Sequence, residues 1–174
     1  MRALVVYESM YGNTARVAEA IAEGLGGATA VEVSAAPDEL PPDLDLVVVG
    51  GPTHAHGMSR ERSRRDAADR ASRPVISRRG IRDWIDGLRP PRPMDAASFD
   101  TRINGPELLT GSAAKGAARA LRGRGFKVAA TESFVLDGMK GEPYDRMPST
   151  ELERARTWGR TLAERLAVGP GRRV

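Results

Sequence analysis

Residues 3–25 read ALVVYESMYGNTARVAEAIAEGL, and this stretch decides the fold. The β-branched run at 3–7 predicts a strand. Residues 13–25 predict a helix, because apolar residues recur four apart from Val17 to Leu25. The short polar loop between them leads directly into the helix, whose first N–H groups have no partners and lie at a partly positive dipole end. The stretch therefore predicts an anion site.

The apolar pattern beyond this stretch alternates between the strand and helix periods. Further strands are expected at 29–34, 46–49, 96–100 and 126–135, and further helices at 81–88, 112–122 and 149–167. Strands that alternate with helices predict an α/β fold, a doubly wound five-stranded parallel sheet with helices on both faces. We expect one domain over residues 1–168 and a flexible tail at 169–174, with Ser149 or Thr150 capping the last helix.

The composition limits the chemistry that the chain can carry out. Its 174 residues include no cysteine, which excludes disulfides, thiol nucleophiles and thiolate-bound metals. Redox chemistry would therefore need a bound cofactor. No stretch approaches the roughly 18 apolar residues of a membrane span. The first strand begins almost at Met1 with no basic and apolar leader before it, so we expect a cytoplasmic protein.

The charge of the chain is basic, with a formal net charge of +4. No nucleic-acid partner is predicted, because only three basic residues are lysines and no aromatic residues alternate with the basic ones. Residues 60–82 nevertheless hold nine arginines. Two interpretations stay open. The segment is a basic lid that attracts an NADPH phosphate or an acidic partner, or it is a solvated helix face with i,i+4 charge pairs from Glu61–Arg65 to Asp69–Arg73.

Two loops that follow expected strands resemble the flavin-contacting loops of flavodoxins. Residues 9–14 (SMYGNT) resemble the family's phosphate loop, usually Ser/Thr-x-Thr-Gly-x-Thr, and residues 50–57 (GGPTHAHG) are similar to its second flavin loop. The resemblance implies a flavodoxin-like sandwich with sheet order 2-1-3-4-5 that binds FMN noncovalently. The Ser-Met-Tyr-Gly form of the first loop is also similar to that of the tryptophan-repressor-binding-protein type of NAD(P)H:quinone reductase, which has the same fold and cofactor.

The first loop contains the donors that a phosphate needs. The Ser9 and Thr14 hydroxyls can donate hydrogen bonds, the loop N–H groups can form a cradle, and Gly12 permits close backbone approach. Asn13 adds a side-chain donor. The implied cofactor residues are Ser9, Met10, Tyr11, Gly12, Asn13 and Thr14. The same small residues also suit an ordinary strand-to-helix turn with no ligand.

The resemblance places the second loop against the isoalloxazine edge of the flavin. The implied contact residues are Pro52, Thr53, His54, Ala55, His56 and Gly57. His54 and His56 are the only histidines of the chain. Either one of them stacks on the ring, bonds to it or relays a proton, or both are ordinary surface residues. A metal site is not predicted, because His-x-His lacks a defined third ligand.

A third contact is implied after the fourth strand, at residues 100–105, with Thr101 and Arg102 as the contact residues. Flavodoxins usually present an aromatic side chain to the ring here, and the sequence has none between Thr101 and Gly125. Either the open flavin face serves a second substrate, or the cofactor is held weakly or not at all.

The expected function is electron transfer with FMN, as a carrier or as a small NAD(P)H- or quinone-linked oxidoreductase. The partners would be a redox protein, or NAD(P)H and a quinone. The basic charge departs from the acidic docking surface of carrier flavodoxins, which favours a reductase or a carrier with an acidic partner. No catalytic residue is assigned. The alternative is a flavin-free module that keeps the fold for binding or interaction.

Overall fold

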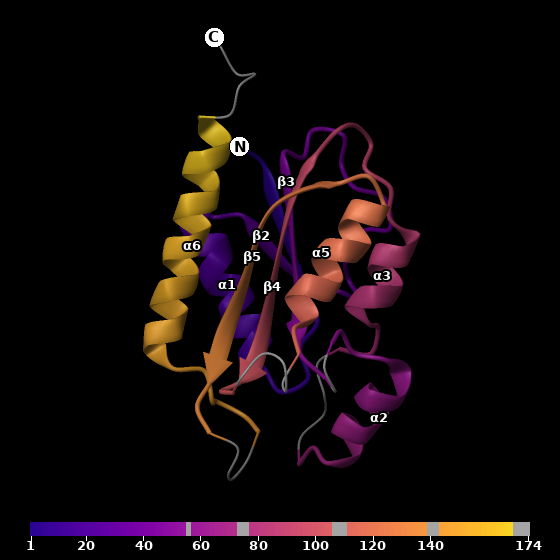
Figure 1. Ribbon diagram of the computed structural model, residues 1–174, viewed down its shortest axis with the longest axis vertical. Helices are drawn as coiled ribbons and strands as arrows, with labels where there is room; N and C mark the ends of the chain where they lie inside the picture. Colours follow the sequence, from indigo (N-terminus) through magenta and orange to yellow (C-terminus); the bar gives the residue numbers. More distant parts are fainter. Residues whose placement is uncertain (55–56, 73–76, 106–110, 139–142, 169–174) are drawn as a thin grey trace.

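The computed structural model describes residues 1–54, 57–72, 77–105, 111–138 and 143–168 of the chain. Strands and helices alternate along it, as Figure 1 shows. The strands are β1 (Ala3–Tyr7), β2 (Thr29–Glu32), β3 (Leu46–Pro52), β4 (Asp95–Ile103) and β5 (Lys127–Leu136). The helices are α1 (Asn13–Gly24), α2 (Glu61–Asp69), α3 (Ile81–Gly87), α5 (Ala113–Gly123) and α6 (Ser149–Ala167). The predicted tail at 169–174 lies outside the described residues.

The five strands form one sheet in the order β2-β1-β3-β4-β5, and every neighbouring pair is parallel. Both the fold class and the strand order predicted from the sequence are confirmed. Parallel strands leave all their carboxyl ends at one edge of the sheet, so the loops after β1, β3 and β4 meet there. This edge is where the candidate site lies.

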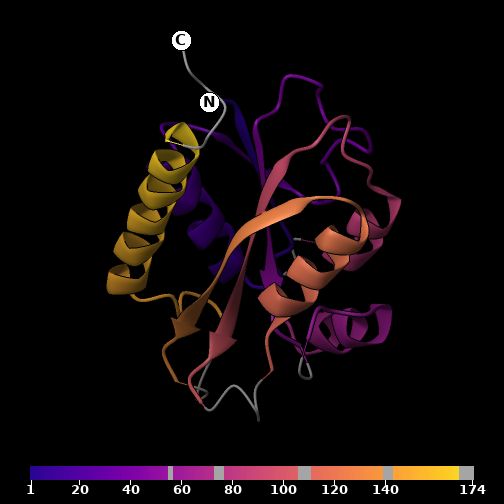
Figure 2. The same cartoon turned by 45° about the horizontal axis from the view of Figure 1, so that its top comes forward.

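Helices cover both faces of the sheet (Figures 1 and 2). α1 and α6 pack against each other on one face, whereas α3 and α5 lie on the other. Successive residues of a strand point to opposite faces, so Val5 and Val48 join the α1–α6 core while Val6 and Val49 join the α3–α5 core. Because both faces are buried, the third strand appears as an unbroken apolar run.

Glycines set the distance between α1 and α6. A Cβ at Gly24 would lie 2.1 Å from the carbonyl oxygen of Arg156, and a Cβ at Gly159 would lie 2.5 Å from that of Ile21. Both distances are far below van der Waals contact, so the two helix backbones touch. α1 ends as its sequence predicts, because Gly26 has a φ of 87°, in the left-handed region that glycine accepts.

Three local expectations are corrected. The fourth strand, expected at 96–100, runs from Asp95 to Ile103, and the third continues through Gly50 to Pro52, so part of each expected loop is strand. Gly50 is required there because a Cβ would lie 2.1 Å from the Phe99 ring. The N-cap of α6 is Pro148, with no side-chain cap, where Ser149 or Thr150 was expected. Among the described residues, no helix is long and apolar enough to cross a membrane.

Candidate functional site

The loop after β1 curls around the side chain of Ser9. The Ser9 hydroxyl oxygen accepts hydrogen bonds from the N–H groups of Gly12, at 3.1 Å, and Ala15, at 3.4 Å. Gly12 has a φ of 89°, in the left-handed region that favours glycine. The loop thereby turns directly into the first turn of α1, with Ser9 buried at its centre.

Backbone N–H groups of this loop are left without acceptors. Within the part of the chain that the structure describes, the N–H groups of Met10, Tyr11, Asn13 and Thr14 form no hydrogen bond. The positive end of the α1 dipole lies at the same place. These N–H groups are free to donate to water or to a bound group. Such a loop at a helix N-terminus suits a group rich in anionic oxygens.

The side chains of the loop bind other parts of the protein. The Asn13 amide donates to the Pro143 carbonyl oxygen at 2.8 Å and accepts from the Arg146 N–H at 2.9 Å. Its oxygen and nitrogen therefore tie α1 to the segment that precedes α6. The Tyr11 hydroxyl donates to the Ala67 carbonyl oxygen at 2.9 Å, which links the loop to α2. The expected side-chain donor of a phosphate site, Asn13, is engaged in holding the fold.

Thr101 and Arg102, expected in a loop, belong to β4. The Thr101 hydroxyl lies 2.7 Å from that of Thr14, and its carbonyl oxygen accepts from the Thr53 N–H at 2.9 Å. The guanidinium of Arg102 donates to the Gly105 carbonyl oxygen at 3.1 Å. Thr101 therefore brings the segments after β1 and β3 together beside the end of β4.

The second loop is anchored by hydrogen bonds of its own. The N–H and carbonyl groups of His54 pair with those of Gly57 at 2.8 and 2.9 Å, which closes a tight turn after Pro52. Ala55 and His56 lie outside the described residues. The burial of His54 lowers the pKa of its imidazole below the ordinary value, and the charge of Arg64 lowers it further. The lowered pKa favours the neutral imidazole, which can both donate and accept a hydrogen bond.

Asp100 holds this edge together, and sequence reasoning gave it no role. One carboxyl oxygen accepts from the Thr53 hydroxyl at 3.1 Å, the Ser112 hydroxyl at 2.7 Å and the Ala114 N–H at 2.9 Å. The Thr53 hydroxyl in turn accepts from the Ala113 N–H at 3.0 Å. The expected flavin contact Thr53 is thus used to fix the start of α5 against β3 and β4.

The comparisons with known proteins agree with this geometry. The family model of flavodoxins matches residues 5–74, the part of the chain that contains the loop after β1 and runs through β3 to α2. The chain has a flavodoxin-like fold. No curated protein matches the sequence.

Solved flavodoxins share the fold of this flavodoxin-like chain over nearly its whole length. Flavodoxin 1 from Bacillus cereus aligns with a TM-score of 0.61 at 17% identity, covering 95% of this chain and 99% of its own. A flavodoxin from the domain Archaea gives 0.56 at 19% identity, covering 96% and 99%. A flavodoxin, WrbA-like protein from Agrobacterium tumefaciens gives 0.55 at 22% identity, covering 95% and 97%. At these identities the likeness concerns the fold.

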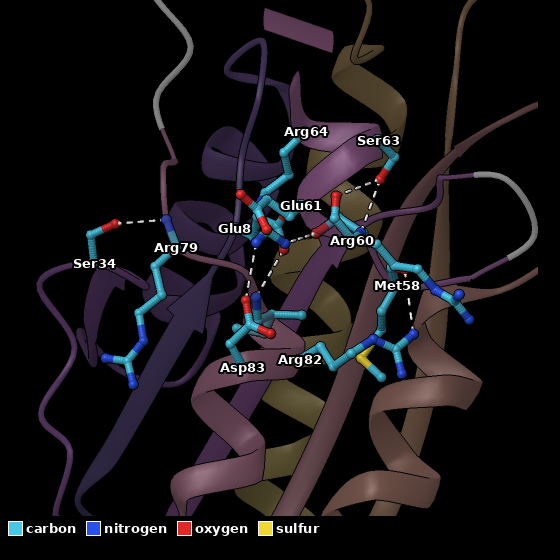
Figure 3. Close-up of polar contacts among 12 residues, drawn as sticks. Glu8, Ser34, Met58, Arg60, Glu61, Ser63, Arg64, Arg79, Arg82 and Asp83 are labelled. Carbon is cyan, nitrogen blue, oxygen red and sulfur yellow. Dashed lines mark hydrogen bonds and ion pairs between the residues drawn. The ribbon is translucent and has the colours of Figure 1, made fainter. Parts of the chain in front are cut away.

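This flavodoxin-like chain buries a carboxyl group, Glu8, at the end of β1. Its side chain is fully buried, and one oxygen accepts from the Ile81 N–H at 2.9 Å (Figure 3). Arg64 lies beside it and donates to Asp83 at 3.0 Å. Burial is the largest influence on Glu8 and raises the pKa of its carboxyl. A charged residue at the end of an apolar strand was the sequence signal that could have singled out Glu8.

The flavodoxin-like chain has an aromatic residue beside the loop after β1, although not where the family usually places it. The rings of Tyr11 and Tyr144 meet edge to face, with centroids 5.5 Å apart. Tyr144 lies in the segment between β5 and α6. Because β5 is parallel to the other strands, this segment begins at the same edge of the sheet as the loop after β1. Burial raises the pKa of Tyr11. The position of Tyr144 after the fifth strand was the signal that sequence reasoning missed.

Proposed function

We propose that this protein binds FMN noncovalently at its carboxyl-terminal sheet edge and transfers electrons with it. The observation that carries the proposal is the set of unpaired N–H groups at Met10, Tyr11, Asn13 and Thr14. A phosphomonoester offers about −1.5 to −2 charges near neutral pH and three acceptor oxygens, which suits such a cradle. The flavodoxin-like fold and the family match over residues 5–74 support the same cofactor.

Different residues of the chain would contact different parts of the cofactor. The backbone of residues 10–14 would hold the phosphate, and the Ser9 hydroxyl, which accepts two N–H groups, keeps its own hydrogen free to donate. Neutral His54 would offer a hydrogen bond at the same edge. When bound, FMN supplies the redox chemistry, accepting and releasing electrons at its ring. The chain has no cysteine that could take over this role.

A titration of the purified protein with FMN tests the proposal. We expect saturable quenching of flavin fluorescence, and a large loss of affinity in a Ser9→Ala/Thr14→Ala variant. A Ser98→Ala variant is the matched control, because Ser98 is also a buried hydroxyl residue but donates to the Ala114 carbonyl oxygen away from the loop. Absence of binding at millimolar FMN, in protein shown to be folded by circular dichroism, would support the flavin-free module instead.

The same preparation separates a reductase from a carrier. NADPH is added anaerobically to the FMN-loaded protein, and the visible flavin band is followed. Bleaching without a partner protein identifies an NAD(P)H-linked oxidoreductase, and bleaching only after a separate reductase is added identifies a carrier.

A further inference from the structure

A second cavity lies beside the site, on the face of the sheet that α3 and α5 cover. It has a volume of about 860 Å³, is partly open to solvent, and is lined by the segment after β3 and by residues of α2, α3 and α5. Its charged lining is strongly basic, with a single acidic residue. The charged residues are Arg60, Arg62, Asp66, Arg82, Lys115 and Arg119. Small-molecule sites in proteins usually have volumes of about 300–1,000 Å³, so the cavity is large enough for such a ligand.

Arginines that line this cavity are not neutralised by the protein. Among the described residues, Arg60, Arg62, Arg82 and Arg119 form no ion pair with an acidic side chain. The i,i+4 pairing expected along α2 is found between Arg65 and Glu61 but not between Arg62 and Asp66. The interpretation of α2 as a self-paired face therefore fails on the side that turns to the cavity.

Arg82, from α3, is the least exposed of the arginines that line the cavity. Its Nε is buried and has no hydrogen-bond partner among the described residues, and an Nη2 contact with the Met58 carbonyl oxygen is long, at 3.5 Å. Figure 3 shows Arg82 extending past Met58. Arg60 lies on the same side of the Glu8–Arg64 contacts in this view. Arg82 therefore adds to the cavity lining a partly buried guanidinium that has no ion-pair partner among the described residues.

We propose that this cavity binds a phosphorylated small molecule, at a site separate from the Ser9–Thr14 loop. Guanidinium groups match phosphate oxygens through paired hydrogen bonds, and several unpaired arginines suit a ligand with more than one negative charge. A small molecule fits better than an acidic protein segment, because the volume of the cavity lies within the range of small-molecule sites.

Isothermal titration calorimetry with inorganic pyrophosphate tests this site at low salt on the FMN-free full chain. The variant Arg62→Ala/Arg119→Ala removes one cavity arginine from α2 and one from α5. Its matched control is Arg65→Ala/Arg122→Ala, which removes one arginine from each of the same two helices outside the cavity lining. Both variants lose the same net charge. A Ser9→Ala/Thr14→Ala variant removes donors of the other site.

We expect the Ser9→Ala/Thr14→Ala variant to retain a pyrophosphate-binding event with the affinity that wild type shows for this cavity, and the Arg62→Ala/Arg119→Ala variant to weaken that event at least about tenfold. The Arg65→Ala/Arg122→Ala variant should stay within about threefold of wild type. Equal weakening in both arginine pairs, or loss of binding in the Ser9→Ala/Thr14→Ala variant, would overturn the proposal. It would also fail if a glutamate hexapeptide bound this cavity more tightly than pyrophosphate, because the ligand would then be an acidic protein segment.

Discussion

Replacing Asp100 by alanine should destabilise the protein strongly, because this residue joins β4 to both the second loop and the start of α5. The substitution removes the acceptor of three hydrogen bonds, from the Thr53 hydroxyl, the Ser112 hydroxyl and the Ala114 N–H. The two hydroxyls can rotate towards other acceptors, but the Ala114 N–H is fixed by the helix and buried. Ser112 also caps α5 by accepting from the Lys115 N–H at 3.2 Å, and it would lose its orientation.

The size of the loss can be estimated from these contacts. A buried donor left without its acceptor costs about 1–3 kcal/mol, and a weakened helix cap costs about 1 kcal/mol more. Relief of the unpartnered second oxygen of Asp100 offsets part of this cost. After this offset we expect the free energy of unfolding to fall by about 1–3 kcal/mol. For a chain of this length that corresponds to a decrease in Tm of about 2–12 °C.

Chemical denaturation followed by circular dichroism measures the change, with Ser98→Ala as the control. Ser98 lies two residues before Asp100 in the same strand and makes one hydrogen bond to the same helix, to the Ala114 carbonyl oxygen at 2.9 Å. Its loss should cost about 1 kcal/mol. If Asp100→Ala proves no more destabilising than Ser98→Ala, the three contacts do not act together and the reasoning is refuted.

Four further substitutions test other parts of the structure. Gly159→Ala should destabilise by more than 1 kcal/mol in thermal unfolding, because its Cβ would lie 2.5 Å from the Ile21 carbonyl oxygen, whereas Gly123→Ala, with nothing within 4 Å, should stabilise by about 0.5–1 kcal/mol. Glu8→Gln keeps the acceptor of the Ile81 N–H but cannot titrate. Folding raises the pKa of Glu8 above 4.5, so the native state binds more protons than the unfolded state. In urea denaturation, wild type should therefore gain stability relative to the variant as the pH falls from 8 towards 4.5. A constant difference across that range would contradict the buried acid. Asn13→Ala should cost about 1–3 kcal/mol and expose the segment around residues 143–147 to hydrogen exchange, and unchanged exchange there would contradict its linking role.

The apolar period was enough to predict a doubly wound parallel sheet, because each core strand and helix buries a face whose spacing is visible in the sequence, whereas the strand order came from the resemblance of the two loops to those of flavodoxins. β3 has an unbroken apolar run, and α1 has apolar residues four apart from Val17 to Leu25. The length of β4 was not predictable in the same way. Its polar residues from Asp100 onward resemble a loop in sequence, and the buried Asp100 and Thr101 are accommodated in a strand because distant residues supply their hydrogen bonds.

Only the part of the candidate site that depends on local sequence was predictable. The loop at residues 9–14 is local, so its glycine and its helix start were visible in the sequence. The roles of the side chains depend on tertiary contacts: Asn13 turns to Pro143, and Thr53 turns to Asp100. Arg62 and Asp66 had the spacing of an ion pair, but spacing alone cannot show that both side chains line a cavity without pairing with each other.

The central claim, that the loop after β1 binds the phosphate of FMN, is tested most directly by comparing FMN with riboflavin. Riboflavin has the same ring and lacks the phosphate. Calorimetric titration of both into the wild-type protein isolates the contribution of the N–H groups between Met10 and Thr14. We predict that FMN binds at least about a hundredfold more tightly than riboflavin, since two or more charge-assisted hydrogen bonds would be lost. Equal affinity for the two flavins, or no binding of FMN, would contradict the account.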